Sequence, residues 1–286
     1  MLLAEYFKEL RVSNCHNEKG RCKLLIDRYE RPSTVEEAYD LLKSTPKSVI
    51  IGGGAYIRLG KKHVDLAIDM CNAELDFINE KDNAIEIGAT TTFRQLEKSE
   101  ILKKYYDGVI PNTVKDLMGV QMRNLVTVGG TIHGKYGFSD LITTLLALKC
   151  NVVLHKRGEI SLEDFLNEKW TDKEILEKIV IQKDERNASF QTMKNTSNDF
   201  SIINVAVCRK DDKYNIVIGA RPSVAALAPN AMAYMDASKG NEYDIELTGQ
   251  IASRELIFAA DLRASKEYRK ELCSVLVKRA LQEVMK

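Results

Sequence analysis

The chain has 286 residues, with 42 basic against 41 acidic side chains and 44% hydrophobic residues. A net charge of +1 gives no electrostatic reason to expect nucleic acid, an anionic membrane or an acidic partner. The composition is that of a folded globular protein, and the length allows one large domain or two to three smaller ones. A mainly disordered chain is therefore excluded.

No segment has the pattern of a membrane span or an export signal. The most apolar stretch, 141–154, contains Lys149 and is too short to cross a bilayer, and the first five residues lack a basic n-region. We therefore expect a cytoplasmic protein that does not enter a membrane. The six cysteines form no C-x-x-C pair and the four histidines no H-x-x-x-H pair, so the sequence carries no local metal signature. Cys15, His16 and Cys22 lie close together, but their spacing favours reduced thiols over a zinc or iron–sulfur site.

Regular structure is predicted only beyond an N-terminal extension, residues 1–24. Overlapping capping boxes, Ser33 with Glu36 and Thr34 with Glu37, predict a helix that ends before Pro46. The elements expected next, in chain order, are a strand at 48–51, a glycine loop at 52–54, a strand at 64–70, a strand at 84–88 and a short helix begun by Thr92 and Gln95.

The segment 117–140 contains five glycines and has no helical periodicity. We expect a long loop here, and long loops inside compact domains are usually functional. At its end, Ser139 and Asp140 are placed to cap an apolar helix over 141–148, which precedes a strand over 152–155.

After residue 182 the pattern changes to strands followed by helices. Two β-rich runs, 202–208 and 214–218, are joined by five charged residues and predict a hairpin. Helices are expected near 229–238, 247–260 and 266–285. Strands followed by helices indicate a small α+β domain, with a boundary near 183–187.

The glycine run 52–54 matches neither common nucleotide-binding motif. The third glycine of the Rossmann fingerprint would fall at Ile57, and Lys62 stands where a P-loop needs Ser or Thr. Three glycines after a buried strand nevertheless let backbone N–H groups converge on an anion, because no Cβ obstructs the approach. A tight turn is the alternative interpretation.

A second glycine pair, Gly129-Gly130, lies between two threonines. Two glycine loops in one α/β domain are able to grip the two phosphates of a dinucleotide, with Asp140 left to accept hydrogen bonds from sugar hydroxyls. A role as helix N-cap fits Asp140 equally well. His133, inside the same loop, is either close to the bound phosphates or an exposed loop histidine.

Together these residues resemble the FAD-binding subunit of molybdenum hydroxylases, the group that includes xanthine dehydrogenase, carbon monoxide dehydrogenase and nicotinate dehydrogenase. The resemblance covers about residues 28–285. It rests on motifs in the right order and spacing. These are Arg31-Pro32, the loop 51–57, Ile68-Asp69, Ile87-Gly88-Ala89-Thr90-Thr91, Gln121-Met122-Arg123-Asn124, Thr127-Val128-Gly129-Gly130, Ser139-Asp140 and Asp261-Leu262-Arg263-Ala264-Ser265.

The resemblance implies an α+β protein with two domains. Residues 25–182 would form a two-part FAD-binding domain of the vanillyl-alcohol-oxidase (PCMH) type, with subdomains at about 25–80 and 81–182. Residues 183–286 would form a small α+β domain of the carbon monoxide dehydrogenase flavoprotein type. In such proteins FAD lies between the two.

The resemblance also implies a set of cofactor-binding residues. They are Gly52, Gly53, Gly54, Ala55, Tyr56 and Ile57 in the first pyrophosphate loop; Thr127, Gly129, Gly130, Thr131 and Gly134 in the second; Asp140 at the ribityl chain; Leu117 near the isoalloxazine ring; and Lys194 as the one nearby cation. No catalytic side chain and no metal ligand is expected. Ala55, Tyr56 and Thr131 depart from the family pattern, which affects the affinity for FAD more than its identity because such loops bind mainly through backbone N–H groups.

The function implied is electron transfer. In this family electrons leave an organic substrate at a molybdopterin centre on a large subunit, pass through 2Fe–2S clusters on a small subunit and reach FAD, which delivers them to NAD⁺ or another acceptor. This chain has no cysteine spacing for a cluster, so those centres must come from partner chains. Two alternatives are a stand-alone FAD-dependent reductase of the same fold and a FAD-less assembly or binding module.

Overall fold

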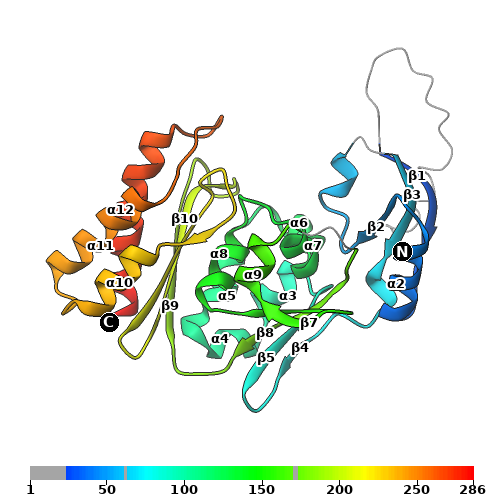
Figure 1. Cartoon of the computed structure of the whole chain (residues 1–286), viewed down its shortest axis with the longest axis horizontal. Helices are drawn as coiled ribbons and strands as arrows, with labels where there is room; N and C mark the ends of the chain where they lie inside the picture. The colour runs from blue at the N-terminus through cyan, green and yellow to red at the C-terminus, as the bar shows by residue number, and fades with distance from the viewer. Residues whose placement is uncertain (1–23, 61–62, 170–172) are drawn as a thin grey trace.

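The computed structural model describes residues 24–60, 63–169 and 173–286. The expected N-terminal extension, including Cys15, His16 and Cys22, lies outside the described residues except for residue 24. Figure 1 shows three parts in a row: a small sheet near the N-terminus, a central sheet with several helices, and a third sheet covered by the C-terminal helices. In the described part of the chain, no helix combines the length and hydropathy needed to cross a membrane.

The first part is a parallel sheet of three strands. Its order is β1 (Leu25–Glu30), β3 (His63–Asp69), β2 (Ser48–Ile51), with α2 (Val35–Ser44) connecting β1 to β2. The Thr34 hydroxyl caps α2 by accepting a hydrogen bond from the Glu37 N–H. The predicted helix is therefore confirmed, although only one of the two overlapping boxes supplies the cap.

The central sheet has five strands, all paired antiparallel. In sheet order they are β4 (Ile78–Glu80), β5 (Ala84–Gly88), β8 (Leu176–Gln182), β6 (Asn151–Leu154) and β7 (Gly158–Ser161). Strands β5 and β6 were predicted. The second sheet starts at β4, which falls just before the division expected near residue 80.

The central part also contains short helices. They are α3 (Phe93–Lys98), α4 (Glu100–Lys104), α5 (Val109–Val114), α6 (Val120–Arg123), α7 (Val128–His133), α8 (Asp140–Ala147) and α9 (Leu162–Asn167). The capping box of Thr92 and Gln95 is formed as predicted. The expectation of a continuous loop over 117–140 is wrong, because α6 and α7 lie within it. Helices of four and six residues make fewer than two turns, so they leave no periodicity to detect.

The third part is an antiparallel sheet. In chain order its strands are β9 (Asn187–Lys194), β10 (Ser201–Lys210), β11 (Lys213–Gly219) and β12 (Ala226–Leu227), and the helices are α10 (Pro229–Ala237), α11 (Glu242–Glu255) and α12 (Lys266–Val284). The predicted hairpin is confirmed, with a turn of only two residues because Lys210 pairs with Lys213. Helix α11 begins five residues before the predicted start at 247, at a capping box of Asn241 and Asp244.

The third sheet is buried on both faces. Ala206, Cys208 and Val217 pack into the core of the central part, where α8 contacts β10 and β11. The alternate residues of the same strands, such as Val207 and Ile216, pack against the C-terminal helices. The third part is thus joined to the central part through a common hydrophobic core.

Candidate cofactor-binding site

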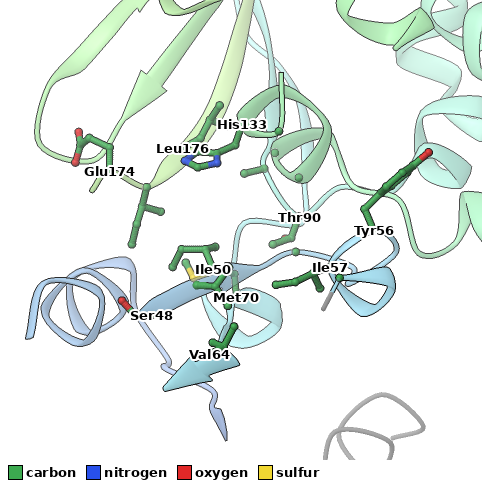
Figure 2. Close-up of a pocket in the computed structure, with 18 of the residues that line it drawn as sticks. Ser48, Ile50, Tyr56, Ile57, Val64, Met70, Thr90, His133, Glu174 and Leu176 are labelled. Atoms are coloured by element: carbon green, nitrogen blue, oxygen red, sulfur yellow. The ribbon is translucent and has the colours of Figure 1, made fainter. Parts of the chain in front are cut away.

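A cavity of about 890 Å³ lies between the first sheet and the central sheet. Figure 2 shows Ile50, Met70 and Val64 on one wall and His133 and Leu176 on the other. This volume is within the range of small-molecule sites, roughly 300–1,000 Å³, and the walls are mainly apolar. We call it the large cavity.

Both glycine loops reach the large cavity. Gly52, Tyr56 and Ile57 line it from the first loop, and Gly129, Gly130 and Gly134 from the second. A smaller hollow, the loop pocket, lies directly between the loops. Its walls include Gly52, Gly53, Gly54, Ala55, Tyr56, Ile57, Thr127, Gly130 and Thr131. Segments separated by some 70 residues are therefore brought together, as the sequence suggested.

The first loop offers unpaired backbone donors. The N–H groups of Gly53, Gly54 and Ala55 have no hydrogen-bond partner among the described residues. A Cβ at Gly53 would lie 1.4 Å from the carbonyl oxygen of Leu125, so no other residue fits there. Gly54 has a φ of +70°, which disfavours any side chain. Successive free N–H groups in such a turn form a site for an anion.

The second loop is different, because its glycine N–H groups are already used. Gly129 donates to the carbonyl of Ala89 at 2.7 Å, and Gly130 donates to the Thr127 hydroxyl at 3.2 Å, which caps α7. The expectation that both N–H groups point at a phosphate is therefore not met. A Cβ at Gly129 would lie 2.7 Å from that of Ala89, so this glycine permits close packing. Thr131 lines the loop pocket with a hydroxyl that has no partner in the described chain.

Asp140 is the first residue of α8 and not its cap. The Ser139 hydroxyl is the cap and accepts from the Ile142 N–H at 3.2 Å, so the N-cap role weighed for Asp140 is wrong. The Asp140 side chain is buried, and its Oδ1 accepts hydrogen bonds from Ser201 and Asn204. These contacts hold the carboxylate in one orientation.

The other oxygen of Asp140, Oδ2, is buried without a hydrogen-bond partner. Burial raises the pKa of this carboxyl, while the bond from Ser201 and the charge of Lys194 oppose the shift. Lys194 Nζ lies 3.8 Å from Oδ2 and donates to the Asp116 carbonyl at 3.3 Å. It lines a separate polar pocket of about 520 Å³ beside α5 and β9. Lys194 thus lies beside Asp140 in the wall of this polar pocket and does not line the large cavity.

Leu117 lines a further narrow hollow, which it shares with Asp140 and Tyr56. The turn at Leu117 is held by Arg123, whose Nη1 donates to the carbonyls of Leu117 at 3.1 Å and Met118 at 2.8 Å. Arg123 Nε also donates to Glu97 at 2.8 Å. Arg123 is buried. It belongs to the motif Gln121-Met122-Arg123-Asn124, but the sequence alone indicated no role for it.

Four aromatic rings stand between the large cavity and Asp140. Tyr56 lies 4.8 Å from Tyr136 and 5.4 Å from Phe138, and Phe138 lies 4.7 Å from Phe200, all between ring centroids. Tyr56 and Tyr136 line the cavity, the loop pocket and the hollow at Asp140. Burial raises the pKa of Tyr56 to about 12, so its hydroxyl stays protonated. We call these four residues the aromatic cluster; no motif in the sequence indicated it.

The residues present fit FAD, the cofactor that the resemblance implies. FAD offers an adenine ring with apolar faces, an anionic diphosphate, sugar hydroxyls and a flat flavin ring. The large cavity, the free N–H groups of 53–55, the Oδ2 of Asp140, which accepts no hydrogen bond, and the aromatic cluster match these four groups in chemistry. The hollows that they line share Tyr56 and Tyr136.

Comparison with protein families gives two matches that together cover most of the described chain. Residues 23–182 match the family described as the FAD binding domain in molybdopterin dehydrogenase. Residues 188–284 match the CO dehydrogenase flavoprotein C-terminal domain.

Individual relatives are similar over most of the chain. The xanthine dehydrogenase FAD-binding subunit of Escherichia coli O157:H7 is 24% identical over 287 residues, covering 90% of this chain and 95% of the relative. The nicotinate dehydrogenase FAD-subunit of Eubacterium barkeri is 31% identical over 146 residues, 48% of this chain and 49% of the relative. A chain of carbon monoxide dehydrogenase from Hydrogenophaga pseudoflava has the same fold, with a TM-score of 0.83 at 21% identity, covering 90% of this chain and 96% of that one.

Proposed function

Because the chain belongs to the family of FAD-binding domains of molybdopterin dehydrogenases, we propose that it passes electrons through FAD inside a molybdenum hydroxylase complex. The electrons would come from 2Fe–2S clusters of a small subunit and leave to NAD⁺ or another acceptor. The relatives are FAD subunits of oxidoreductases, and FAD is the cofactor. The observation that carries the proposal is the succession of three neighbouring hollows, the large cavity, the loop pocket and the hollow at Asp140, which share Tyr56 and Tyr136 as lining residues.

Each of these hollows has a task in binding and orientation. Bound FAD would supply a carrier that exchanges electrons one or two at a time. The N–H groups of 53–55 would bind the diphosphate, and Asp140 Oδ2 would accept hydrogen bonds from ribityl hydroxyls. Leu117, fixed by Arg123, would pack near the isoalloxazine ring, while Lys194 would balance the charge of Asp140.

The organisation of the complex is also part of the proposal. Its partners would be a molybdopterin-binding large subunit and a 2Fe–2S small subunit. The relatives are themselves named as subunits, which supports a role inside a complex. The four described cysteines are free thiols, as is usual in a reducing compartment, which supports a place in the cytoplasm. We further propose that residues 25–182 form the FAD-binding domain and residues 183–286 the C-terminal domain.

The proposal is tested in the assembled complex by removing the flavin. Organic substrate should still reduce the iron–sulfur clusters, but electron delivery to the acceptor should stop and return when FAD is added. Acceptor reduction that continues without flavin would contradict the proposed role. Full turnover of an organic substrate by this chain alone would instead favour a stand-alone reductase.

A further inference from the structure

Figure 2 shows the ring of His133 pointing into the large cavity. It is the last residue of α7, and its ring lies near Leu176, opposite Ile50 on β2. Sequence reasoning left two readings open for it, a ligand contact or an exposed loop residue. The structure places it on a helix, with its ring facing a space of ligand size.

The imidazole has no hydrogen-bond partner among the described residues. Its surface is accessible, yet burial is the main cause that lowers its pKa, followed by the charge of Lys135. The accessible ring lies in the wall of the large cavity, close to the surrounding protein. These surroundings favour a neutral ring.

The surrounding titratable groups do not supply a counter-charge. The other titratable residues of the cavity wall are Lys47, Tyr56, His63, Tyr136 and Glu174. Glu174 Oε2 accepts hydrogen bonds from the N–H groups of Lys156 and Arg157 at 3.2 and 3.1 Å, whereas Oε1 is buried without a hydrogen-bond partner. Lys135 is the charge that shifts the pKa of His133, and no carboxylate contributes, so an anion bound beside the ring would be its main negative neighbour.

We propose that His133 binds the diphosphate of the nucleotide where the large cavity meets the loop pocket, at Gly52 and Gly130, and takes up a proton when the nucleotide binds. The inference rests on the proposed function, because it takes FAD as the ligand. His133 and Gly130 line the same cavity three residues apart, and Gly52 of the first loop lines it from the other side. A diphosphate between the glycine loops would meet the ring, and its charge would stabilise the imidazolium through a charge-assisted hydrogen bond.

The sign of the pH dependence follows from linkage. The pKa of His133 lies below its ordinary value in the free protein and is raised when the anion binds. Affinity is then constant above the pKa of the complex and rises by up to about tenfold per pH unit as the pH falls between the two pKa values. Below the pKa of the free protein it becomes constant again.

Calorimetric titration of the full chain with ADP, adenosine and FAD between about pH 5.5 and pH 8 tests this inference. FAD, whose diphosphate is a diester with constant charge over this range, should bind more tightly at low pH with proton uptake, measured in buffers of different ionisation enthalpy, whereas adenosine should show neither effect. ADP is compared only between variants at one pH, because its terminal phosphate titrates at about pH 6. His133→Asn and His133→Gln should remove the pH dependence of FAD binding and weaken ADP binding at low pH about tenfold. His63→Asn is the matched control, because His63 also lines the cavity but its ring is already paired with Asp27 at 2.9 Å.

Two results would overturn the inference: the same pH dependence in both His133 variants, or an equal loss of adenosine binding. FAD binding that is tight and independent of pH would reject the role of His133 and leave the proposed function intact. Absence of FAD binding at every pH, with ADP still bound and coupled to His133, would instead reject FAD as the ligand.

Discussion

Asp140 combines burial with a free acceptor atom, and this costs the folded protein stability. Its pKa is raised on folding, so the ionised form is disfavoured and the stabilising contribution of this group falls as the pH rises above the ordinary value of 3.8. Such a cost is expected where a ligand later supplies the missing hydrogen bonds.

Asp140→Asn is therefore expected to separate binding from stability. FAD affinity should fall about five- to 150-fold, or roughly 1–3 kcal/mol, because a charge-assisted bond is weakened. The melting temperature of the flavin-free protein should not fall, since the burial cost of the charge is removed. Flavin titration and thermal melts measure both, with exposed Asp40→Asn as control. Normal FAD binding with a lowered melting temperature would make Asp140 a purely structural residue.

Some residues of the site could be predicted from the sequence and others could not. The glycine positions and Asp140 were found because motif spacing is local information. The aromatic cluster was missed because Tyr56, Tyr136 and Phe200 come from three distant segments, and only folding brings their rings within about 5 Å. The hydrogen bond from the Gly129 N–H to the Ala89 carbonyl could not be predicted for the same reason, because it joins two segments that are distant in the sequence.

Helix α7 carries the second glycine pair and His133, and its start depends on one hydroxyl. Thr127→Ala should lower the free energy of unfolding by about 0.5–2 kcal/mol, because the Gly130 N–H loses its acceptor. Thr127→Ser keeps the hydroxyl and should restore most of that loss. Urea unfolding of the three proteins makes the comparison. Equal stability of the alanine and serine variants would show that the cap contributes nothing.

The turn between α5 and α6 depends on Arg123. Arg123→Ala should cost about 1–3 kcal/mol of unfolding free energy, since the carbonyls of Leu117 and Met118 lose a buried donor. FAD affinity should fall as well, because Leu117 is released. Arg94→Ala is the control: it removes the other arginine on Glu97, a partly exposed i,i+3 pair, and should cost less than about 1 kcal/mol. Equal losses in the two variants would contradict this assignment.

The elements that were predicted correctly carry their signals within their own residues. Helices α2 and α3 have caps at Thr34 and Thr92, and the β10–β11 hairpin has two clear strands around a polar turn. Strands β4, β7 and β8 were missed because they are short or gain stability only from distant partners. The capping box at Asn241 was readable and would have corrected the start of α11.

At the scale of the whole molecule, the two expected domains share a core. Ala206, Cys208 and Val217 belong to the third sheet yet pack with the central part. We therefore expect the whole flavin-free chain to unfold in one calorimetric transition whose measured enthalpy equals the van't Hoff enthalpy. Two resolved transitions, one lost on cutting near 183–187, would show instead that the domains fold independently.

The first sheet and the central part enclose the large cavity and are linked by few polar contacts. Glu36 on α2 pairs with His155 and Lys156, both at 2.8 Å, and Lys173 donates to the Leu42 carbonyl at 2.8 Å. A ligand that bridges the two walls would stabilise the whole chain, by about 2.7 kcal/mol at a hundredfold excess over its dissociation constant. Thermal melts with and without FAD would show this as a higher melting temperature.

The most direct measurement is the flavin content of the purified protein before and after acid precipitation, followed by titration of the stripped chain with FAD and FMN. About one FAD per chain should be found, released by acid into the supernatant, and the stripped chain should take up FAD far more tightly than FMN because only FAD fills the large cavity. A protein that neither contains nor takes up FAD, or that keeps flavin on the denatured chain, would contradict a noncovalent FAD site built from these loops and Asp140.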